Sequence, residues 1–295
     1  MKVNKQRLLF VVNPISGGKS KKRLEEIIRR TLDLERFSWV IKRTAFAGHA
    51  LEIVKEEAAD YDAVIAVGGD GTINEIAREL SHTTIPMGII PLGSGNGLAR
   101  HLKIPLDVHK AIDYLNHALP QEVDTLRMNG HFFVSIAGVG FDSLIASEFE
   151  KQKGRGFVNY AKLTIREFFH YQENEFNLNI DGQKYRRKAH LISFANSNQF
   201  GYRTIISPQA DISDGLVDVC IITKPKLWQI PRLFLQMWME RADQSSLVEI
   251  IRGKEIELWP NNDIFANIDG ESVKVGEKIQ VKLFPKSLKI MMQKK

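Results

Sequence analysis

Cysteine is nearly absent from this sequence, because Cys220 is the single one among 295 residues and no internal disulfide can form. Cys220 lies in the apolar run of residues 217–223, which predicts a buried, unreactive thiol rather than a nucleophile. No run of about 18 apolar residues occurs, so nothing is expected to span a bilayer. The apolar stretch at residues 8–12 is also too short for a signal peptide. We therefore expect a reduced, intracellular, cytoplasmic protein.

Low-complexity segments and extremes of composition are lacking as well. Hydrophobic residues make up 43% and charged residues 26%, which excludes a disordered chain, and the length suits about two domains. The formal net charge of +6 favours anionic partners. Because the basic residues are dispersed and no motif combines them with aromatic residues, we expect no nucleic acid among these partners. The histidines show no metal-ligand spacing, so we assign them no role.

The first part of the chain alternates short apolar runs with helical patterns. The runs at residues 8–12, 39–41, 63–67 and 87–90 predict strands, and residues 19–32, 48–59, 72–80, 98–102 and 107–115 predict helices. This alternation is typical of a parallel sheet covered on both faces. We expect an α/β domain over residues 1–123, with a ligand at the carboxyl ends of its strands.

After about residue 123 strand-like segments dominate and Asp-Gly and Asn-Gly turns separate them, which predicts an antiparallel β-sandwich-like domain over residues 124–284. Three helical segments interrupt it, at residues 143–151, 156–171 and 227–239. The expected strands are residues 132–137, 176–180, 189–195, 216–223, 247–251, 255–259, 264–268 and 279–284.

The strongest functional signal is Gly68-Gly-Asp-Gly-Thr72, directly after a buried strand. The glycines let backbone N–H groups approach an anion, and we expect Thr72 to cap a helix whose positive end faces a phosphate. Asp70 would repel a polyphosphate, so it implies either a divalent cation or a hydrogen-bonding role.

Two further glycine-rich loops follow neighbouring strands. Residues 13–20 read Asn-Pro-Ile-Ser-Gly-Gly-Lys-Ser, and Asn13 stands where a Walker-type P-loop needs glycine, so that motif is rejected. This glycine-rich, hydroxyl-bearing loop, with Lys19 nearby, remains a candidate nucleotide contact. The third loop, Pro91-Leu-Gly-Ser-Gly-Asn-Gly97, is similar in its small residues. Three such loops at the carboxyl ends of successive strands predict one phosphate-binding site.

Three Asp-Gly pairs occur in the second half of the chain. Asp181-Gly182 predicts a hairpin turn. From local spacing the same interpretation is favoured for Asp214-Gly215 and Asp269-Gly270, and only a wider pattern would assign them another role.

That wider pattern is present. The segments Asn13 to Lys19, Gly68 to Glu75, Pro91 to Asn96, Ala137-Gly-Val-Gly-Phe-Asp142, Ser213-Asp-Gly-Leu216 and Ile268-Asp-Gly-Glu271 occur in this order. Together they resemble the diacylglycerol kinase catalytic family, which includes sphingosine kinases and bacterial lipid kinases. The resemblance implies an ATP-binding domain, to which the last residues from about 285 to 295 return, and a lipid-binding β-rich domain.

The resemblance also implies roles for particular residues. Asp269 and Glu271 would supply the general base, and Asp124 would assist Asp269. Asp214, with the backbone carbonyls of Asp211 and Leu216, would hold a structural Mg²⁺. The residues expected to contact ATP are Asn13, Pro14, Ser16, Gly17, Thr44, Gly68, Gly69, Asp70, Gly71, Thr72, Asn74, Ser94 and Asn96.

The implied reaction is transfer of the γ-phosphate of ATP to the hydroxyl of diacylglycerol or a related lipid. Gly97 departs from the Asp that many bacterial members carry and is similar to sphingosine and ceramide kinases, which leaves a sphingoid base as an alternative acceptor. An NAD kinase shares only the Gly-Gly-Asp-Gly-Thr block, and a nucleotide-binding protein without turnover is a further alternative. The oligomeric state stays open.

The lipid partner predicts contact with an anionic membrane surface. Residues 227–239 are a candidate for an acyl-pocket wall or for a helix at the inner face of the membrane, and core packing is the equal alternative. Basic runs at residues 21–23, 151–155 and 186–188 would favour the same surface, although such runs are more often solvated faces.

Overall fold

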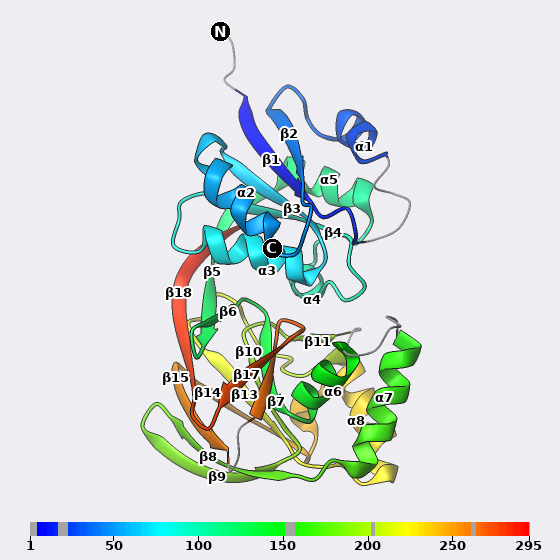
Figure 1. Cartoon of the computed structure of the whole chain (residues 1–295), viewed down its shortest axis with the longest axis vertical. Helices are drawn as coiled ribbons and strands as arrows, with labels where there is room; N and C mark the ends of the chain where they lie inside the picture. Colours follow the sequence, from blue (N-terminus) through cyan, green and yellow to red (C-terminus); the bar gives the residue numbers. More distant parts are fainter. Residues whose placement is uncertain (1–4, 17–22, 151–156, 202–203, 261–263, 295) are drawn as a thin grey trace. The chain divides into compact units, whose positions relative to one another are not determined.

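The computed structural model describes residues 5–16, 23–150, 157–201, 204–260 and 264–294 (Figure 1). The chain divides into two compact units, Met1–Val123 with Lys286–Lys295, and Asp124–Pro285. Two long strands, β5 (Leu119–Met128) and β18 (Ile279–Met292), each contribute residues to both units. In the described part of the chain, no helix has both the length and the apolar content that crossing a bilayer requires.

The first unit contains a parallel sheet in the order β2-β1-β3-β4, with the end of β18 beside β4. Its strands β1, β3 and β4 are apolar almost throughout because both faces of the sheet are covered. The bounds are β1 Gln6–Val12, β2 Phe37–Arg43, β3 Ala63–Gly68 and β4 Met87–Pro91. The four strands predicted from the apolar runs are therefore present.

Helices cover both faces of this sheet. One face packs against α1 and α5, whose buried residues share a core cluster with Phe10 and Ile65. In Figure 1, α2 and α3 lie on the opposite side of the sheet from α1 and α5. The helices are α1 Leu24–Thr31, α2 His49–Glu57 continued by the 3₁₀ turn Ala58–Asp60, α3 Asp70–Leu80, α4 Gly97–His101 and α5 Val108–His117.

The second unit packs two antiparallel layers around one core. A six-stranded sheet has the order β14-β13-β10-β7-β16-β17, and strands β15, β8 and β9 follow the first part of β18. Side chains from both layers form the core cluster, for example Phe194 and Val219 from one layer with Phe176 and Leu258 from the other. The expected combination of an α/β domain with an antiparallel sandwich-like domain is confirmed.

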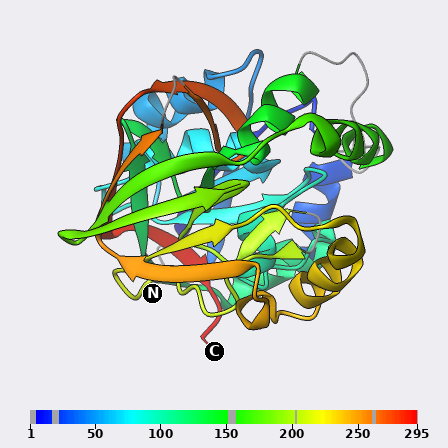
Figure 2. The same cartoon turned by 90° about the horizontal axis from the view of Figure 1, so that it is seen from below.

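Both faces of the six-stranded sheet are buried, and side chains that alternate along each strand pack into different core clusters. Val219 and Ile221 of β13 point into the sandwich core, whereas Cys220 and Ile222 pack on the other face with residues of α6, α7 and α8. Figure 2 shows these three helices gathered along one side of the unit. Cys220 is a free, buried thiol, as predicted, and burial raises its pKa.

The remaining element bounds differ in places from the prediction. The expected strand at residues 132–137 is wrong as a single element, because it is interrupted at residues 134–135 between β6 and β7. Residues 227–239 form a 3₁₀ turn and then α8, which has Pro231 in its first turn. The elements are β6 His131–Phe133, β7 Ile136–Gly140, α6 Phe141–Glu150, α7 Phe157–His170, β8 Asn174–Ile180, β9 Gln183–Ala189, β10 Leu191–Ala195, β11 Gln199–Gly201, β12 Thr204–Ile205, β13 Val217–Ile222, η3 Leu227–Gln229, α8 Ile230–Trp238, η4 Ala242–Gln244, β14 Val248–Gly253, β15 Glu255–Pro260, β16 Ile264–Ile268 and β17 Glu271–Gly276.

Candidate functional site

In the first unit, Asp70 joins two of the glycine-rich loops. Its Oδ2 accepts the backbone N–H of Asn96 and its Oδ1 accepts that of Gly97, both at 2.8 Å. Burial raises the pKa of the Asp70 carboxyl, while these N–H donors and the nearby Arg100 act in the opposite direction. Of the two roles considered for Asp70, the hydrogen-bonding role is present in this structure.

The same two loops meet backbone against backbone. A Cβ on Gly93 would lie 2.7 Å from the Cα of Gly69, and one on Gly95 would lie 2.8 Å from Oδ2 of Asp70. Real Cβ atoms do not approach so closely, so the glycines are required for this contact. A surface without side chains leaves backbone N–H groups accessible at the start of α3, which suits an anion, whereas those of Asn96 and Gly97 at the start of α4 are bound by Asp70.

Asn96 holds the shape of the loop after β4. It adopts a left-handed backbone conformation with φ of 54°, and its side chain bonds both the N–H and the carbonyl of Gly93 at 2.8 Å. The Arg100 Nε then donates to the Gly95 carbonyl at 2.9 Å. Asn96 is buried, and these hydrogen bonds show that its side chain stabilises the conformation of the loop.

The loop after β1 contacts the same region through Asn13. Its Nδ2 donates to Oγ1 of Thr72 at 3.0 Å, and its Oδ1 accepts the N–H of Ile15 at 2.9 Å. The expected capping role of Thr72 is wrong, because α3 begins at Asp70 and Gly69 is its N-cap residue. Ser16 Oγ closes the turn by donating to the Asn13 carbonyl at 3.1 Å. Gly17 and Lys19 lie outside the described residues.

Two other residues predicted to contact ATP are Thr44 and Asn74. The backbone N–H of Thr44, which is buried just after β2, donates to the Val12 carbonyl at 2.9 Å. Asn74 belongs to the second turn of α3. Thus residues after β1, β2, β3 and β4 gather at the carboxyl edge of the sheet, as the order of the motifs predicts.

A cavity of about 620 Å³ lies beside the loop after β4. Gly93, Ser94 and Asn96 line it together with residues of α1 and α5. Its lining includes the basic side chains of Arg23 and Arg100, and also His109 and the acidic Asp107. The cavity is large enough for part of a nucleotide and carries positive charge beside the loops.

In the second unit, Asp269 and Gly270 form the turn between β16 and β17, with φ values of 47° and 97°. The hairpin interpretation from spacing is therefore correct for the backbone. The Asp269 carboxylate also binds a segment outside the turn, because it accepts hydrogen bonds from the N–H groups of Val134, Ser135 and Ile136 at 2.9–3.1 Å. Glu271 begins the next strand and is exposed. The turn thus presents two acidic residues at one sheet edge.

A buried carboxyl supports this turn from inside the unit. Asn267 accepts the N–H of Gly270 at 3.0 Å through Oδ1, and its Nδ2 donates to Oδ2 of Asp142 at 2.8 Å. Asp142 is buried at the start of α6, and burial raises its pKa to about 6. Asp142, the last residue of the motif at residues 137–142, is therefore connected to the Asp269 turn through the side-chain amide of Asn267.

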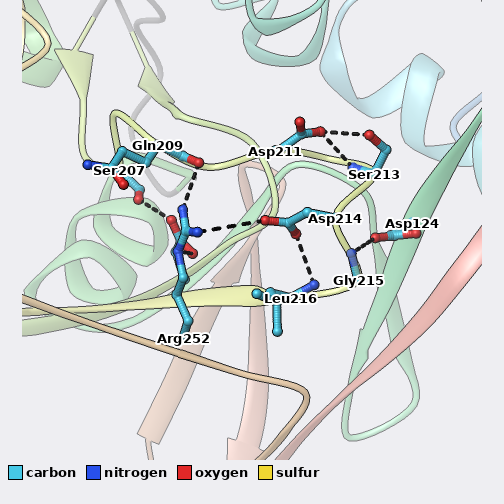
Figure 3. Close-up of polar contacts among 10 residues, drawn as sticks. Asp124, Ser207, Gln209, Asp211, Ser213, Asp214, Gly215, Leu216 and Arg252 are labelled. Carbon is cyan, nitrogen blue, oxygen red and sulfur yellow. Dashed lines mark hydrogen bonds and ion pairs between the residues drawn. The ribbon is translucent and has the colours of Figure 1, made fainter.

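Asp124 is fully buried and holds the loop before β13 (Figure 3). Its Oδ2 accepts the N–H of Gly215 at 2.7 Å, and its own N–H donates to the Ile212 carbonyl at 2.7 Å. Asn196 connects this strand with the Asp269 turn, because its Nδ2 donates to the carbonyls of both Asp124 and Val134. The predicted pair of Asp124 and Asp269 is thus linked through Asn196 and Val134.

The loop at residues 211–216 contains the expected Mg²⁺ ligands. Asp214 Oδ1 accepts the N–H of Leu216 at 3.0 Å, and Arg252 lies 3.9 Å from Oδ2 (Figure 3). Burial, with Asp218 and Asp211 nearby, raises the pKa of Asp214, although the Leu216 N–H and Arg252 oppose this. One carboxylate and two carbonyl oxygens are the hard donors that Mg²⁺ prefers, so these residues fit the ion. Within the described residues, no cluster of three His, Cys, Asp or Glu side chains offers another metal site.

Comparison with known proteins assigns the family. Residues 7–128 match the model of the diacylglycerol kinase catalytic domain, and residues 135–292 match that of the YegS C-terminal NAD kinase beta sandwich-like domain. A diacylglycerol kinase of Mycobacterium tuberculosis is 30% identical over 221 residues, covering 72% of each chain. The chain belongs to the diacylglycerol kinase family. It is therefore a lipid kinase, and a kinase family implies the use of ATP.

Other relatives agree with this assignment. A diacylglycerol kinase of Bacillus subtilis is 27% identical over 277 residues, covering 90% of both proteins. A solved structure of a diacylglycerol kinase from Bacillus anthracis has a TM-score of 0.74 at 19% identity and covers 97% of both chains. Another structure from that organism has a TM-score of 0.82 at 22% identity, with 99% of this chain covered. These two structures support the fold.

Some residues of this lipid kinase were not found from the sequence. Asn267 and Asn196 bind the backbone around Asp269 and Asp124, but an isolated Asn near a strand end carries no distinctive pattern. Asp142 ends the motif at residues 137–142, but no role was predicted for it. Arg252, which reaches Asp214 and Asp218 from β14, is far away in the sequence. The basic run at residues 151–155 lies outside the described residues.

Proposed function

We propose that this lipid kinase transfers the γ-phosphate of ATP to the hydroxyl of diacylglycerol or a related lipid, with Mg²⁺ as the divalent ion. The observation that carries the proposal is the bridge from Asp70 to the N–H groups of Asn96 and Gly97. It joins two glycine-rich loops at the carboxyl edge of a parallel sheet, where phosphates bind in such folds.

The first unit binds the triphosphate in this proposal. Backbone N–H groups at residues 68–72 and those of Ser94 and Gly95 face the phosphate oxygens, and Asn13 and Thr72 fix the neighbouring loop. Pro14, Ser16, Gly17 and Thr44 complete the contacts after β1 and β2. The basic cavity next to Ser94 accommodates a further part of the nucleotide. Phosphoryl transfer depends mainly on positioning and charge neutralisation, which these groups provide.

The second unit supplies the base. A lipid hydroxyl loses its proton as it attacks the γ-phosphate, and a carboxylate oxygen of Asp269 or Glu271 accepts that proton. Three backbone N–H groups hold the Asp269 carboxylate in one orientation, which favours its use as a positioned base. Asp124 assists indirectly by holding the chain that Asn196 connects to Val134.

In this proposal the role of Mg²⁺ at Asp214 is structural. Asp214, with the carbonyl oxygens of Asp211 and Leu216, holds the ion at the loop before β13. When bound, Mg²⁺ neutralises the carboxylate charge there. The residues of this loop then keep Gly215 against Asp124.

The test is phosphorylation of a lipid panel by the purified protein with radiolabelled ATP and Mg²⁺, followed by mass spectrometry of the product. The panel contains diacylglycerol, sphingosine, ceramide and, as a non-lipid acceptor, NAD. Labelled phosphatidic acid supports the proposal. A phosphorylated sphingoid base would support the alternative acceptor suggested by Gly97, and labelled NADP alone, or ATP binding without transfer, would refute the proposal.

Asp269→Asn tests the base and has a matched control in the same unit. We expect kcat to fall by about 10²- to 10⁴-fold, the usual contribution of a general base. Asp181 also begins a left-handed Asp-Gly hairpin turn, and its carboxylate accepts the N–H groups of Lys254 and Glu255. Asp181→Asn makes the same chemical change with a similar structural cost. Because Asp181 has no role in the proposed reaction, this variant should keep full activity. Equal kcat in the two variants would contradict the role of Asp269.

A further inference from the structure

The helix α8 and the turn before it expose an unusual number of large apolar side chains. Trp228 is 72% exposed, Trp238 is 58% exposed and Phe234 is 57% exposed. Leu227, Leu235 and Met239 are 47–58% exposed. We call these six residues the α8 face.

The α8 face is distinct from the part of the helix that packs on the core. Leu233 and Met237, one turn apart, are buried in the cluster that lies under the six-stranded sheet. Phe234 and Trp238 follow each of them by one residue and therefore point to another side of the helix. Core packing of residues 227–239, the equal alternative at the outset, accounts for only two of the eight large apolar side chains named here. A helix that is apolar on several sides is normally buried, so the α8 face calls for a partner.

The charged residues of the segment that carries the α8 face, residues 223–239, are all basic. Residues 223–239 contain no Asp or Glu, and Lys226, Arg232 and Arg241 are exposed beside the apolar side chains. Lys226 places its Nζ 5.0 Å from the ring centre of Trp228. Glu240 is the single acidic residue between positions 224 and 241. Tryptophan with a basic rim is typical of segments that enter the interface of an anionic bilayer.

We propose that the α8 face docks the enzyme on an anionic phospholipid bilayer, with Trp228, Phe234 and Trp238 entering the interface and Lys226 and Arg232 contacting lipid phosphates. The inference rests on the proposed function in one respect, because a long-chain lipid acceptor resides in a bilayer. A second copy of this chain fits less well as the partner. A symmetric dimer would place the same basic rim on both sides of the contact, where like charges repel.

Vesicle binding without ATP tests the proposal separately from catalysis. The full chain is sedimented with vesicles of phosphatidylglycerol and phosphatidylcholine, and with vesicles of phosphatidylcholine alone. We expect binding to the anionic vesicles, and at least a tenfold loss, worth about 1.4 kcal/mol, in the triple variant Trp228→Ser, Phe234→Ser, Trp238→Ser. Lys226→Glu with Arg232→Glu should lower anionic binding and leave the weak binding to neutral vesicles unchanged.

The matched control is Leu34→Ser, which removes an exposed apolar side chain (39% exposed) from the first unit and should bind as the unaltered chain does. A second control reports position directly. Brominated lipids should quench tryptophan fluorescence in the unaltered chain, and Trp228→Phe with Trp238→Phe should remove this quenching while vesicle binding is retained. Circular dichroism verifies that each variant is folded.

Activity on two forms of substrate separates this proposal from the proposed function. The triple variant should lose activity on long-chain lipid in vesicles but keep it on short-chain lipid dispersed in detergent. Absence of activity on both lipids in the unaltered chain would refute the function, while vesicle binding would still test the α8 face. Equal vesicle binding by the triple variant, or a dimer that the triple variant converts to a monomer, would overturn the docking proposal.

Discussion

The buried Asp142 predicts a measurable pH dependence of folding. Asp142 lies at the start of α6 with Asn267 as its hydrogen-bond partner, and Gly138 of strand β7 adjoins its carboxyl. Burial is the main cause that raises its pKa from 3.8 to about 6, since the Asn267 hydrogen bond acts in the opposite direction. The folded state therefore favours the protonated carboxyl.

The sign of the effect follows from proton binding. Well below pH 3.8 the carboxyl is protonated in both the folded and the unfolded chain, so it causes no pH dependence. As the pH rises, the unfolded chain releases this proton first, and the folded state loses stability until the folded carboxyl also ionises above about pH 6. A difference of roughly two pKa units is worth about 3 kcal/mol, so this is the expected loss at neutral pH.

Asp142→Asn removes the titrating group and keeps an oxygen that accepts the Asn267 hydrogen bond. We expect the variant to gain stability over the unaltered chain by about 3 kcal/mol more at pH 7 than at pH 3.8 or below, and most of this gain to develop between about pH 4 and 6. Urea unfolding followed by tryptophan fluorescence measures it, because Trp228, Trp238 and Trp259 all lie in the second unit. A stability difference that is constant from pH 4 to pH 8 would refute the argument.

The remaining predictions concern single residues of the two units. Gly93→Ala should raise KM for ATP by about tenfold or more, because the added methyl group meets the Gly69 backbone; an unchanged KM would contradict the contact. Asp70→Leu removes the acceptor of two N–H groups and should destabilise the first unit by about 2–4 kcal/mol in urea unfolding. Mg²⁺ should raise the melting temperature of the chain but not that of Asp214→Asn, and equal shifts would argue against the Asp214 site. Cys220 should not react with a thiol reagent in the folded chain and should react fully in urea, since it is buried.

Much of the architecture was predictable because the apolar runs are strong local signals. Residues 8–12, 63–67 and 87–90 are buried from both sides, so their continuous apolar character identifies central parallel strands. The break between β6 and β7 was not predictable, since Val134 and Ser135 continue a strand-like pattern. Their N–H groups leave the strand pairing and bind the distant Asp269 carboxylate instead.

At the start of α3, Thr72 is another residue whose hydrogen-bond partner could not be predicted from the local sequence. A Thr after glycines is a good helix cap by local preference, but its hydroxyl accepts a hydrogen bond from Asn13, which is 59 residues earlier. The α8 segment is a further case, because its sequence is equally suited to a core helix or to an exposed one. Burial of Leu233 and Met237, with exposure of Trp228 and Trp238, separates the two alternatives.

The order of glycine-rich and Asp-Gly motifs along the chain was sufficient to indicate the family, the two kinds of sheet and the residues to inspect. Such motifs depend on backbone freedom and on residue type, which are local properties. The partners of Asp70, Asp142 and Asp269 depend on which segments the fold brings together, since each carboxylate accepts hydrogen bonds from residues 26 to 135 positions away. Long-range hydrogen bonds of this kind arise from packing and leave no periodic pattern in the sequence. In α8, which carries large apolar residues on several sides, the sequence pattern also does not show which side faces water.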